Sequence, residues 1–580
     1  METANSPSYG NARSVSVALA GSGGAGVMTA ANLLLEAAAQ AGYYGLMTRS
    51  SGPQIRGGEA AAMLRIATDP VDGPDDRFDA LVAIDWQNVG RFAAEILLDG
   101  SSLVIGDPAQ GEPPEAYART GALGASIAFK QIAKSSPGGW PNMVALGVLA
   151  ELVGLPLAAV KTAVAKSLKK GSDALEGNLA AVTAGMSEAR KLGPAKRLAP
   201  PQSSATRWLI TGNQAAGYGA IRGGVRFVAA YPITPGTELL EWMAPSLAKV
   251  GGILVQAEDE LASINMILGA SFGGVPSLTA TSGPGLALMI EALGLGVASE
   301  IPVVVVDVMR GGPSTGIPTK TEQSDLNIAV YGLHGDAPHL VLAPNSVADC
   351  LRTAQLAVQL AEKLQVPAIV LSDQFLGQAR AIVERPADSG LTADRLCAEP
   401  NVPEYKRYAL TPSGVSPVAI PGTPGIAYTA DGLSHNERGL PSSQASDHLA
   451  QLDKRQRKLE SVDYSAHWAD VEGEGELAII TWGSCTGPAR EAHARARADG
   501  LAVKLISMRL LSPAQPEHLA RELKGVKRAL VVEQSHSAQF GRYLRAEYDL
   551  PCRIDSLHRP GPLPVRPTEI HSELIRMSRI

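Results

Sequence analysis

Short apolar runs rich in Val, Ala, Leu and Ile alternate along this chain with longer runs of helical periodicity. Clear examples are residues 15–20 (VSVALA), 301–309 (IPVVVVDVM) and 477–482 (LAIITW). Continuous runs of this kind are typical of strands buried on both faces of a parallel sheet, and the intervening helices supply the crossover connections. The alternation predicts an α/β fold of several doubly wound, mostly parallel sheets with helices on both faces.

Length and composition narrow the class of protein. A chain of 580 residues predicts roughly three to five domains, at ~100–200 residues per domain. With 45% hydrophobic and 19% charged residues, it is an ordinary globular protein. The net charge of −6 leaves no basic excess to neutralise a phosphate backbone, which argues against nucleic acid as the main partner.

The cysteines and the apolar stretches indicate a compartment. The four cysteines are Cys350, Cys397, Cys485 and Cys552. They are too dispersed for a CxxC metal or iron–sulfur site, and such sparse use suits a reducing compartment. The most apolar stretch, residues 143–160, contains Glu151 and Pro156 and so falls short of a membrane-spanning helix. Since residues 1–14 also lack a secretory pattern, we expect a cytoplasmic protein without membrane insertion.

Shifts in composition predict the domain boundaries. Residues 192–207 are crowded with Pro, Ser and basic residues and lack periodicity, which is typical of a linker. Residues 386–472 are rich in Pro and Gly and predict an irregular connection. The predicted units are a flexible tail (1–12), an α/β domain (13–191), the linker (192–207), a second α/β domain (208–385), the connection (386–472) and a third α/β domain (473–580).

A glycine-rich turn follows the first predicted strand. Gly21, Gly23 and Gly26 satisfy the G-x-G-x-x-G pattern before a helix. The predicted buried face of that helix consists of Val27, Ala30, Ala31, Leu34 and Ala38. A helix N-terminus favours an anion, but dinucleotide binding also needs an acid about 20 positions on, and none occurs before Glu59. NAD is therefore disfavoured, and the turn either binds a phosphate-bearing ligand or binds nothing.

Thr234 lies in residues 231–235 (YPITP), directly after a predicted strand. Two prolines restrict the backbone around it, and a helix is predicted to begin just beyond. A hydroxyl at the carboxyl end of a strand lies where α/β sheets bind ligands. The alternative is that Thr234 only caps the next helix.

Three acids open the helix predicted within residues 257–274 (AEDELASINMILGASFGG). Its predicted buried face consists of Leu261, Ile264, Leu268 and Phe272. Complementing the helix dipole is a sufficient role for Glu258 and Asp259. Glu260 directly precedes the apolar stripe and could be drawn inward, where a carboxylate is costly unless it binds something. A protonatable ring nitrogen is one suitable partner.

Arg310 ends the Val-rich strand 301–309 and precedes the glycine-rich residues 311–316 (GGPSTG). A guanidinium at this position matches a carboxylate ligand in two-point fashion. The alternative is a surface arginine on a loop. No GxxxxGK[ST] and no GxSxG motif occurs, and among the ten scattered histidines His435 is the one we most expect to reach a site.

Together these segments resemble one family, the 2-oxoacid:ferredoxin oxidoreductases, and within it the α subunit with a fused N-terminal γ domain. The resemblance rests on residues 21–26 (GSGGAG), 52–59 (GPQIRGGE), 231–235, 257–274, 279–285 (TATSGPG), 310–327 (RGGPSTGIPTKTEQSDLN) and 332–339 (GLHGDAPH). It covers nearly the whole chain, and its middle motifs are highly specific. It implies a γ domain at 13–191, a thiamine-diphosphate pyrimidine-binding domain at 208–385 and a transketolase C-terminal-like domain at 473–580.

The resemblance implies roles for particular residues. Glu260 matches the glutamate that hydrogen-bonds the aminopyrimidine of thiamine diphosphate. Thr234 and Arg310 match residues that bind the carboxylate and keto oxygen of the 2-oxoacid. All three are therefore expected to be catalytic or substrate-binding residues.

The γ domain is expected to help bind coenzyme A. Its candidate contacts are Gly23, Gly24, Gly26 and Arg56. A coenzyme A site would explain a glycine turn that suits an anion but lacks an acidic partner for a ribose.

The resemblance also implies partners. This chain shows neither a GDG…N motif for diphosphate and Mg²⁺ nor a cysteine cluster for [4Fe–4S], and in this family both belong to the β subunit. We therefore expect an α₂β₂ assembly that is active only with β and provides no metal ligand from this chain. The expected reaction is the reversible conversion of 2-oxoglutarate to succinyl-CoA with coenzyme A and ferredoxin.

Several alternatives stay open. Residues 415–418 read VSPV, without the arginine common in 2-oxoglutarate-type enzymes, and residues 434–437 read SHNE in place of an EHNE-like motif. Pyruvate, branched-chain or aryl 2-oxoacids such as indolepyruvate therefore remain candidate substrates. Outside the family, a nicotinamide-dependent dehydrogenase is opposed by the missing acid. A non-catalytic scaffold subunit is opposed by the retention of Glu260, Thr234 and Arg310.

Overall fold

The computed structural model describes residues 12–52, 58–167, 172–193, 196–201 and 207–579. The chain forms two compact units, Met1–Ile210 with Ala379–Ala387, and Thr211–Gln378 with Asp388–Ile580. The sequence predicts residues 379–385 in the second α/β domain and residues 386–387 in the connection, but the whole segment Ala379–Ala387 belongs to the first unit. It groups with the N-terminal unit because strand β14 (Arg380–Val383) pairs with β2 (Tyr44–Ser51). No helix among the described residues is long and apolar enough to cross a membrane.

The N-terminal unit is built on an eight-stranded sheet of order β6-β5-β4-β1-β3-β2-β14-β7. Its remaining strands are β1 (Ser14–Gly21), β3 (Ala60–Ala67), β4 (Ala80–Ala83), β5 (Leu103–Gly106), β6 (Leu123–Ser126) and β7 (Trp208–Thr211). Its helices are α1 (Val27–Gln40), α2 (Glu115–Ala118), α3 (Phe129–Ser135), α4 (Pro141–Val153), α5 (Leu157–Ser167) and α6 (Ser172–Arg190), with short 3₁₀ turns at Val89–Phe92 and Pro108–Gln110. Strands β1, β4, β5 and β6 are parallel, but β3 runs antiparallel to β1 and β2, so this sheet is mixed.

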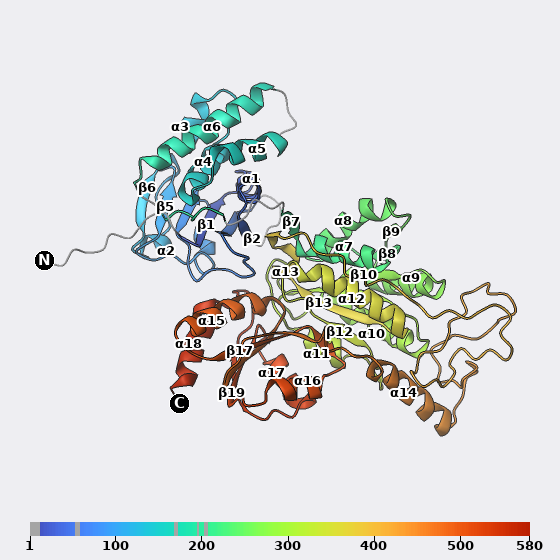
Figure 1. The fold of residues 1–580 in the computed structure, drawn as a ribbon. Helices are drawn as coiled ribbons and strands as arrows, with labels where there is room; N and C mark the ends of the chain where they lie inside the picture. Colours follow the sequence, from blue (N-terminus) through green and yellow to red (C-terminus); the bar gives the residue numbers. More distant parts are fainter. Residues whose placement is uncertain (1–11, 53–57, 168–171, 194–195, 202–206, 580) are drawn as a thin grey trace. The chain divides into compact units, whose positions relative to one another are not determined.

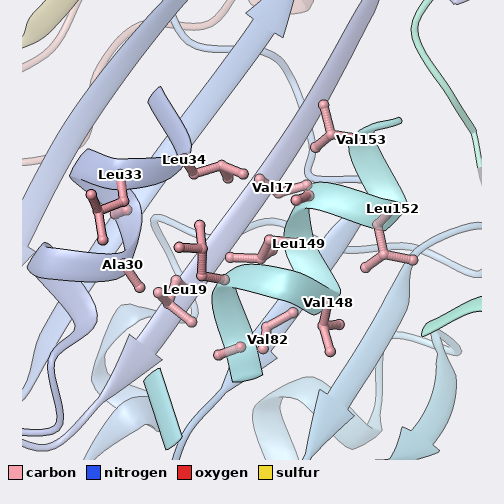
Figure 2. Packing of buried hydrophobic residues seen from close by; sticks show 14 of the residues in the cluster. Val17, Leu19, Ala30, Leu33, Leu34, Val82, Val148, Leu149, Leu152 and Val153 are labelled. Carbon is pink, nitrogen blue, oxygen red and sulfur yellow. The ribbon is translucent and has the colours of Figure 1, made fainter. Parts of the chain in front are cut away.

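The core of this unit follows from the alternation of side chains along β1. Val17 and Leu19 face α1 and α4, which pack on the same side of the sheet (Figure 2). Ala18 and Ala20 point to the opposite face and pack among a second set of buried residues. The five α1 residues predicted to be buried are all buried, which confirms that part of the sequence analysis.

The second unit contains two sheets (Figure 1). The seven-stranded sheet has the order β18-β12-β13-β11-β10-β8-β9 and is parallel except at β18. Its strands are β8 (Phe227–Ala230), β9 (Ile253–Gln256), β10 (Ser277–Thr281), β11 (Val304–Met309), β12 (Leu340–Leu342), β13 (Ala368–Asp373) and β18 (Leu510–Ser512). The associated helices are α7 (Gly212–Gly223), α8 (Thr237–Ala248), α9 (Glu260–Phe272), α10 (Gly283–Ala298), α11 (Leu326–Tyr331), α12 (Asp349–Leu364) and α13 (Gln374–Gln378).

The five-stranded sheet has the order β15-β17-β16-β19-β20. Its strands are β15 (Ala469–Glu472), β16 (Leu477–Trp482), β17 (Val503–Met508), β19 (Arg528–Glu533) and β20 (Arg553–His558). A 3₁₀ turn at Gly483–Cys485 follows β16, and the helices are α15 (Thr486–Ala498), α16 (Pro516–Glu522), α17 (Gln539–Glu547) and α18 (Pro567–Ser578). Several contacts join this sheet to the seven-stranded one. Among them, β18 pairs with β12, and the buried Gln323 side chain bonds Trp482 and Gln534.

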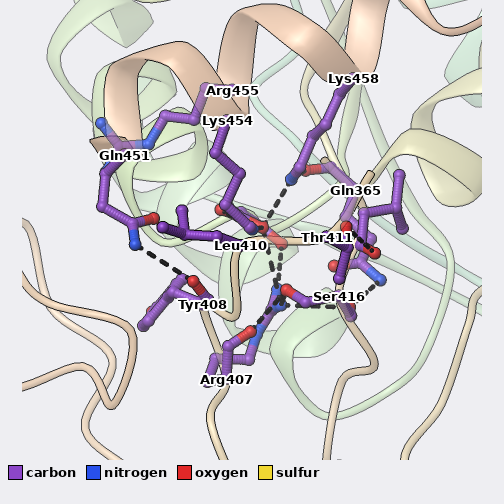
Figure 3. A network of polar contacts seen from close by, with 12 residues as sticks. Gln365, Arg407, Tyr408, Leu410, Thr411, Ser416, Gln451, Lys454, Arg455 and Lys458 are labelled. Atoms are coloured by element: carbon purple, nitrogen blue, oxygen red, sulfur yellow. Dashed lines mark hydrogen bonds and ion pairs between the residues drawn. The ribbon is translucent and has the colours of Figure 1, made fainter. Parts of the chain in front are cut away.

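The connection at 386–472 carries helix α14 (Ala445–Glu460) and a buried network of charges (Figure 3). Glu300, just after α10, forms ion pairs with Lys454 at 2.5 Å, Lys458 at 2.6 Å and Arg407 at 3.6 Å. All four side chains are at most 2% exposed. One carboxylate thus fastens both the irregular segment and α14 to the end of α10.

Burial and charge act against each other in this network. Burial raises the pKa of Glu300, but the three cations more than reverse that effect, so its pKa lies below the ordinary value. Burial lowers the pKa of Lys454 to about 8 and lowers that of Lys458 well below its ordinary value, although Glu300 opposes both shifts. The Glu300 carboxylate therefore offsets part of the cost of burying three cations.

We predict that Glu300→Gln removes about 3–5 kcal/mol of stability, because it leaves buried cations unpaired. Urea unfolding of the purified chain measures this loss. Glu291→Gln is the matched control, since Glu291 is exposed on α10. Equal unfolding midpoints for the two variants would contradict the stabilising role of the network.

Candidate active site

Four turns meet at one edge of the seven-stranded sheet. The neighbouring parallel strands β9, β8, β10 and β11 are followed by Glu260, Thr234, Gly283 and Arg310, respectively. Because the carboxyl ends of parallel strands lie at the same edge, the fold gathers these residues in the crevice where open α/β sheets bind ligands. All three residues predicted for catalysis belong to this edge.

Glu260 is the first residue of α9 and lies in its buried stripe. The buried positions of the helix are Glu260, Ser263, Ile264, Ile267, Leu268 and Ser271, a spacing of one helix face. Asp259 caps the helix by accepting a hydrogen bond from the Ala262 N–H at 2.6 Å. The expectation that Leu261 is buried is wrong: its side chain is 51% exposed, because the face begins at Glu260 itself.

The Glu260 carboxyl group lies against the first turn of α10. A methyl group at Gly285 would stand 2.8 Å from Glu260 Oε1 and 2.0 Å from Thr281 Oγ1, so only glycine leaves room there. Glu260 is 7% exposed, and none of the hydrogen bonds between described residues reaches its carboxylate. A buried carboxylate needs a hydrogen-bond donor. A protonatable ring nitrogen, as in the aminopyrimidine of thiamine diphosphate, is a suitable donor at this position.

Thr234 does not cap the following helix. The N-cap of α8 is Gly236, and Thr234 instead precedes the cis bond to Pro235. Its backbone carbonyl accepts a hydrogen bond from Arg310 Nη1 at 2.6 Å. The capping alternative is therefore wrong, and Thr234 and Arg310 lie together.

Arg310 is buried rather than on the surface. It is 6% exposed, and its Nε–H has no hydrogen-bond partner among the described residues. Burial lowers the pKa of the guanidinium, while Asp325 and Asp307 act to raise it. The surface-loop alternative is therefore wrong, and the site contains a buried cation next to a backbone carbonyl.

Two acidic residues that sequence reasoning missed lie beside Arg310. Asp307 is fully buried in β11, and Asp325 precedes α11. A methyl group at Gly283 would stand 2.6 Å from Asp325 Oδ2, so the two glycines of the α10 turn make room for two carboxyl groups. A signal for Asp307 was present, since it is the single charged residue inside the run 301–309.

The glycine turn belongs to the N-terminal unit. Gly24 and Gly26 adopt φ values of +90° and +81°, and Gly23 is exposed. The Ser22 N–H donates to both Asp85 carboxylate oxygens, at 3.0 and 3.1 Å. One donor of the turn is thus already satisfied by the protein's own carboxylate. Arg56, the fourth candidate, lies outside the described residues.

Each of the two units matches a model of a known protein family. The model of the "Pyruvate flavodoxin/ferredoxin oxidoreductase, thiamine diP-bdg" family matches residues 218–454, and that of the pyruvate ferredoxin/flavodoxin oxidoreductase family matches residues 16–188. The 2-oxoacid:ferredoxin oxidoreductase subunit alpha of Sulfolobus sp is 32% identical, over 90% of each chain. The chain belongs to the 2-oxoacid:ferredoxin oxidoreductases, as an α subunit.

Two further relatives have more specific names. The 2-oxoglutarate oxidoreductase subunit KorA of Mycobacterium tuberculosis is 35% identical, over 74% of this chain and 66% of KorA. A solved 2-oxoglutarate:ferredoxin oxidoreductase from Magnetococcus marinus, with 2-oxoglutarate, coenzyme A and succinyl-CoA bound, aligns with a TM-score of 0.91 and 37% identity, over 98% of this chain and 100% of that one. The resemblance drawn from the motifs is confirmed.

In this oxidoreductase subunit, the contacts of His435 lie outside the four turns at the sheet edge. Its ring stacks 3.9 Å from Tyr408, and its Nδ1 contacts the Leu433 carbonyl oxygen at 2.9 Å. Burial lowers its pKa. No described contact joins it to Glu260, Thr234 or Arg310, so the expectation that His435 reaches the site gains no support.

We predict that Gly285→Ala weakens folding by about 1–3 kcal/mol, because the added methyl group collides with Thr281 and Glu260. Gly294→Ala is the control in the same helix, since nothing lies within 4 Å of the added methyl group there. Alanine at that position should leave stability unchanged or raise it by up to about 1 kcal/mol. Urea unfolding that ranks the two variants in the opposite order would refute the close approach at Gly285.

Proposed function

We propose that this α subunit converts 2-oxoglutarate and coenzyme A to succinyl-CoA and CO₂ while ferredoxin is reduced, and that it also catalyses the reverse reaction. The observation that carries the proposal is the buried Glu260 carboxylate, which has no hydrogen-bond partner among described residues and lies at the same sheet edge as Thr234 and Arg310. Thiamine diphosphate, when bound, would supply a nucleophilic carbon and an electron sink.

In this proposal Glu260 holds the aminopyrimidine ring. Its carboxylate accepts a hydrogen bond from a ring nitrogen and stabilises the form of the ring that carries the added proton. The low exposure of Glu260 strengthens that hydrogen bond, because water does not compete for it. The Gly285 position lets the ring approach the first turn of α10.

Thr234 and Arg310 bind the substrate in this proposal. The Arg310 Nη1 group is engaged by the Thr234 carbonyl oxygen, so the guanidinium is held in place while its other N–H groups remain for a carboxylate. The Thr234 hydroxyl would donate to the keto oxygen. Holding both ends of the 2-oxoacid aligns its keto carbon for attack.

A β subunit completes the site in this proposal. It would hold the diphosphate, Mg²⁺ and [4Fe–4S], in an α₂β₂ assembly that passes electrons to ferredoxin. Large apolar side chains next to the site residues support a partner surface: Tyr231, Leu261 and Ile317 are 40%, 51% and 44% exposed. We also propose that the N-terminal unit is the γ domain and contacts coenzyme A through the glycine turn.

The names of two relatives support 2-oxoglutarate as the proposed substrate. The Mycobacterium tuberculosis and Magnetococcus marinus proteins are named for this substrate, whereas the Sulfolobus protein is named only for 2-oxoacids. Pyruvate, branched-chain and aryl 2-oxoacids are therefore the alternatives. A cytoplasmic location is also part of the proposal.

Activity with a β partner tests the role of Glu260. Glu260→Gln should lower kcat by about 10²–10⁴-fold, because a neutral amide oxygen accepts a hydrogen bond but lacks the negative charge that stabilises the protonated ring. Glu258→Gln is the control, since Glu258 is exposed and two positions away. The assay follows viologen reduction by the co-purified complex, and gel filtration checks its assembly. Unchanged turnover in Glu260→Gln would remove Glu260 from the mechanism.

The same complex tests the substrate. We expect viologen reduction that depends on coenzyme A with 2-oxoglutarate, and much less with pyruvate, indolepyruvate or phenylpyruvate. Faster reduction with one of the latter would assign that 2-oxoacid. No reduction with any of them, in a complex that holds a [4Fe–4S] partner, would contradict the proposed function.

A further inference from the structure

Asp307 is a fully buried acid in the middle of a central strand. In β11 it lies opposite Thr281 of β10 and Leu371 of β13. Neither of these neighbours carries a charge that could pair with it. The charged groups that act on the Asp307 carboxyl are Asp325 and Arg310. Neither Asp307 oxygen accepts a hydrogen bond from a described residue.

The pair of carboxyl groups retains a proton. Burial raises the pKa of Asp307 well above its ordinary value, and the neighbouring Asp325 raises it further. Burial also raises the pKa of Asp325, to about 6, although the hydrogen bond from Asp307 and the charge of Arg310 oppose this. The directions of these shifts favour one proton kept by the pair at neutral pH, since two adjacent carboxylates cannot both ionise without cost.

The ionised member of the pair is placed at a helix N-terminus. The Asp325 carboxyl group lies beside Gly283, where a methyl group would approach both of its oxygens to within 2.7 Å. Gly283 opens α10, a helix of 16 residues, and its first turn favours a negative charge. A negative charge is therefore favoured on Asp325 rather than on Asp307.

Arg310 connects the pair to the substrate site. It follows Asp307 by three residues and is attracted by both carboxyl groups, while its Nη1 donates to the Thr234 carbonyl oxygen. With one shared proton, the two acids and the guanidinium have no net charge. A pair without the proton would make the cluster negative and repel a carboxylate ligand, whereas a cluster without either acid would leave a buried cation uncompensated.

We propose that Asp307 and Asp325 are positioning residues, a carboxylic acid–carboxylate pair that holds one proton and keeps Arg310 charged and oriented for the carboxylate of the 2-oxoacid. This inference rests on the function proposed above. It assigns the strength of substrate binding, and its pH dependence, to two residues that need not touch the substrate.

The other ionisable groups around the pair are few. Glu322, from the segment before α11, raises the pKa of Asp325. On β13, Asp373 lies opposite Met309, and its own pKa is raised by burial. Glu260 lies against the second glycine of the same α10 turn. Of these acids, Glu322 favours retention of the proton, and Arg310 is the cation that opposes it.

The inference predicts a pH-dependent KM in the assembled α–β complex. As pH rises through about 6, Asp325 ionises and the net positive charge near the substrate disappears, so KM for 2-oxoglutarate should rise. Asp307→Asn keeps a hydrogen-bond donor toward Asp325 and should hold KM within about threefold at pH 7. It should also abolish any further rise in KM at alkaline pH, because an amide has no proton to lose.

Asp307→Leu separates positioning from packing. It fills similar space without the donor, so it should raise KM at least about tenfold with a smaller effect on kcat. It should also move the KM transition to higher pH, because the hydrogen bond that lowers the pKa of Asp325 is lost. Rescue by Asn but not by Leu is the expected pattern. Equal KM values and equal pH profiles in the two variants would overturn the positioning role.

Infrared difference spectroscopy of the same complex tests the proton without any turnover. The unmodified complex should show the carbonyl stretch of a protonated carboxyl group at pH 8, sensitive to exchange into D₂O and absent in Asp307→Asn. Absence of this band in the unmodified complex overturns the shared proton, whether or not Asp307→Leu folds. A band accompanied by no oxidation of any 2-oxoacid would instead overturn the proposed function and the role given to Arg310, which distinguishes the two failures.

Discussion

The candidate site depends on the close packing of two carboxyl groups against the first turn of α10. Gly283 and Gly285 have no side chains, so Asp325 and Glu260 approach the same helix N-terminus from two sides. The helix dipole stabilises negative charge there. Because β10 leads directly into this turn, the position of both carboxyl groups is determined by the central part of the sheet rather than by a flexible loop.

Two buried clusters of charge in the second unit differ in how fully they are satisfied. Glu300 is enclosed by Lys454, Lys458 and Arg407 and makes several short ion pairs, which suits a structural role. At the sheet edge, Arg310 Nε and the Asp307 oxygens lack such partners among the described residues. For Arg310, incomplete pairing in a buried place is typical of a group that binds a ligand, whereas the unpaired Asp307 oxygens fit a carboxyl group that keeps its proton.

Sequence reasoning found three of the candidate residues because they follow strands. Each buried strand ends at a recognisable turn, and Glu260, Thr234 and Arg310 all stand at such ends. It misjudged the phase of α9, since the apolar letters suggested a face through Leu261 while the helix actually buries Glu260. It also missed Asp307, although a single charge inside the apolar run 301–309 was a signal, and Asp325, because its relation to Asp307 joins distant segments and has no local signature.

Local periodicity and motifs at strand ends were enough to predict the α/β class, the parallel strands of the second unit, the three candidate residues and the family. The folded chain was needed to show that β14 joins the N-terminal sheet, that β18 pairs with β12, and that the charges of Asp307 and Asp325 act on Arg310. These features depend on strand order and on contacts between distant segments, and neither is encoded in the spacing of residues along the chain.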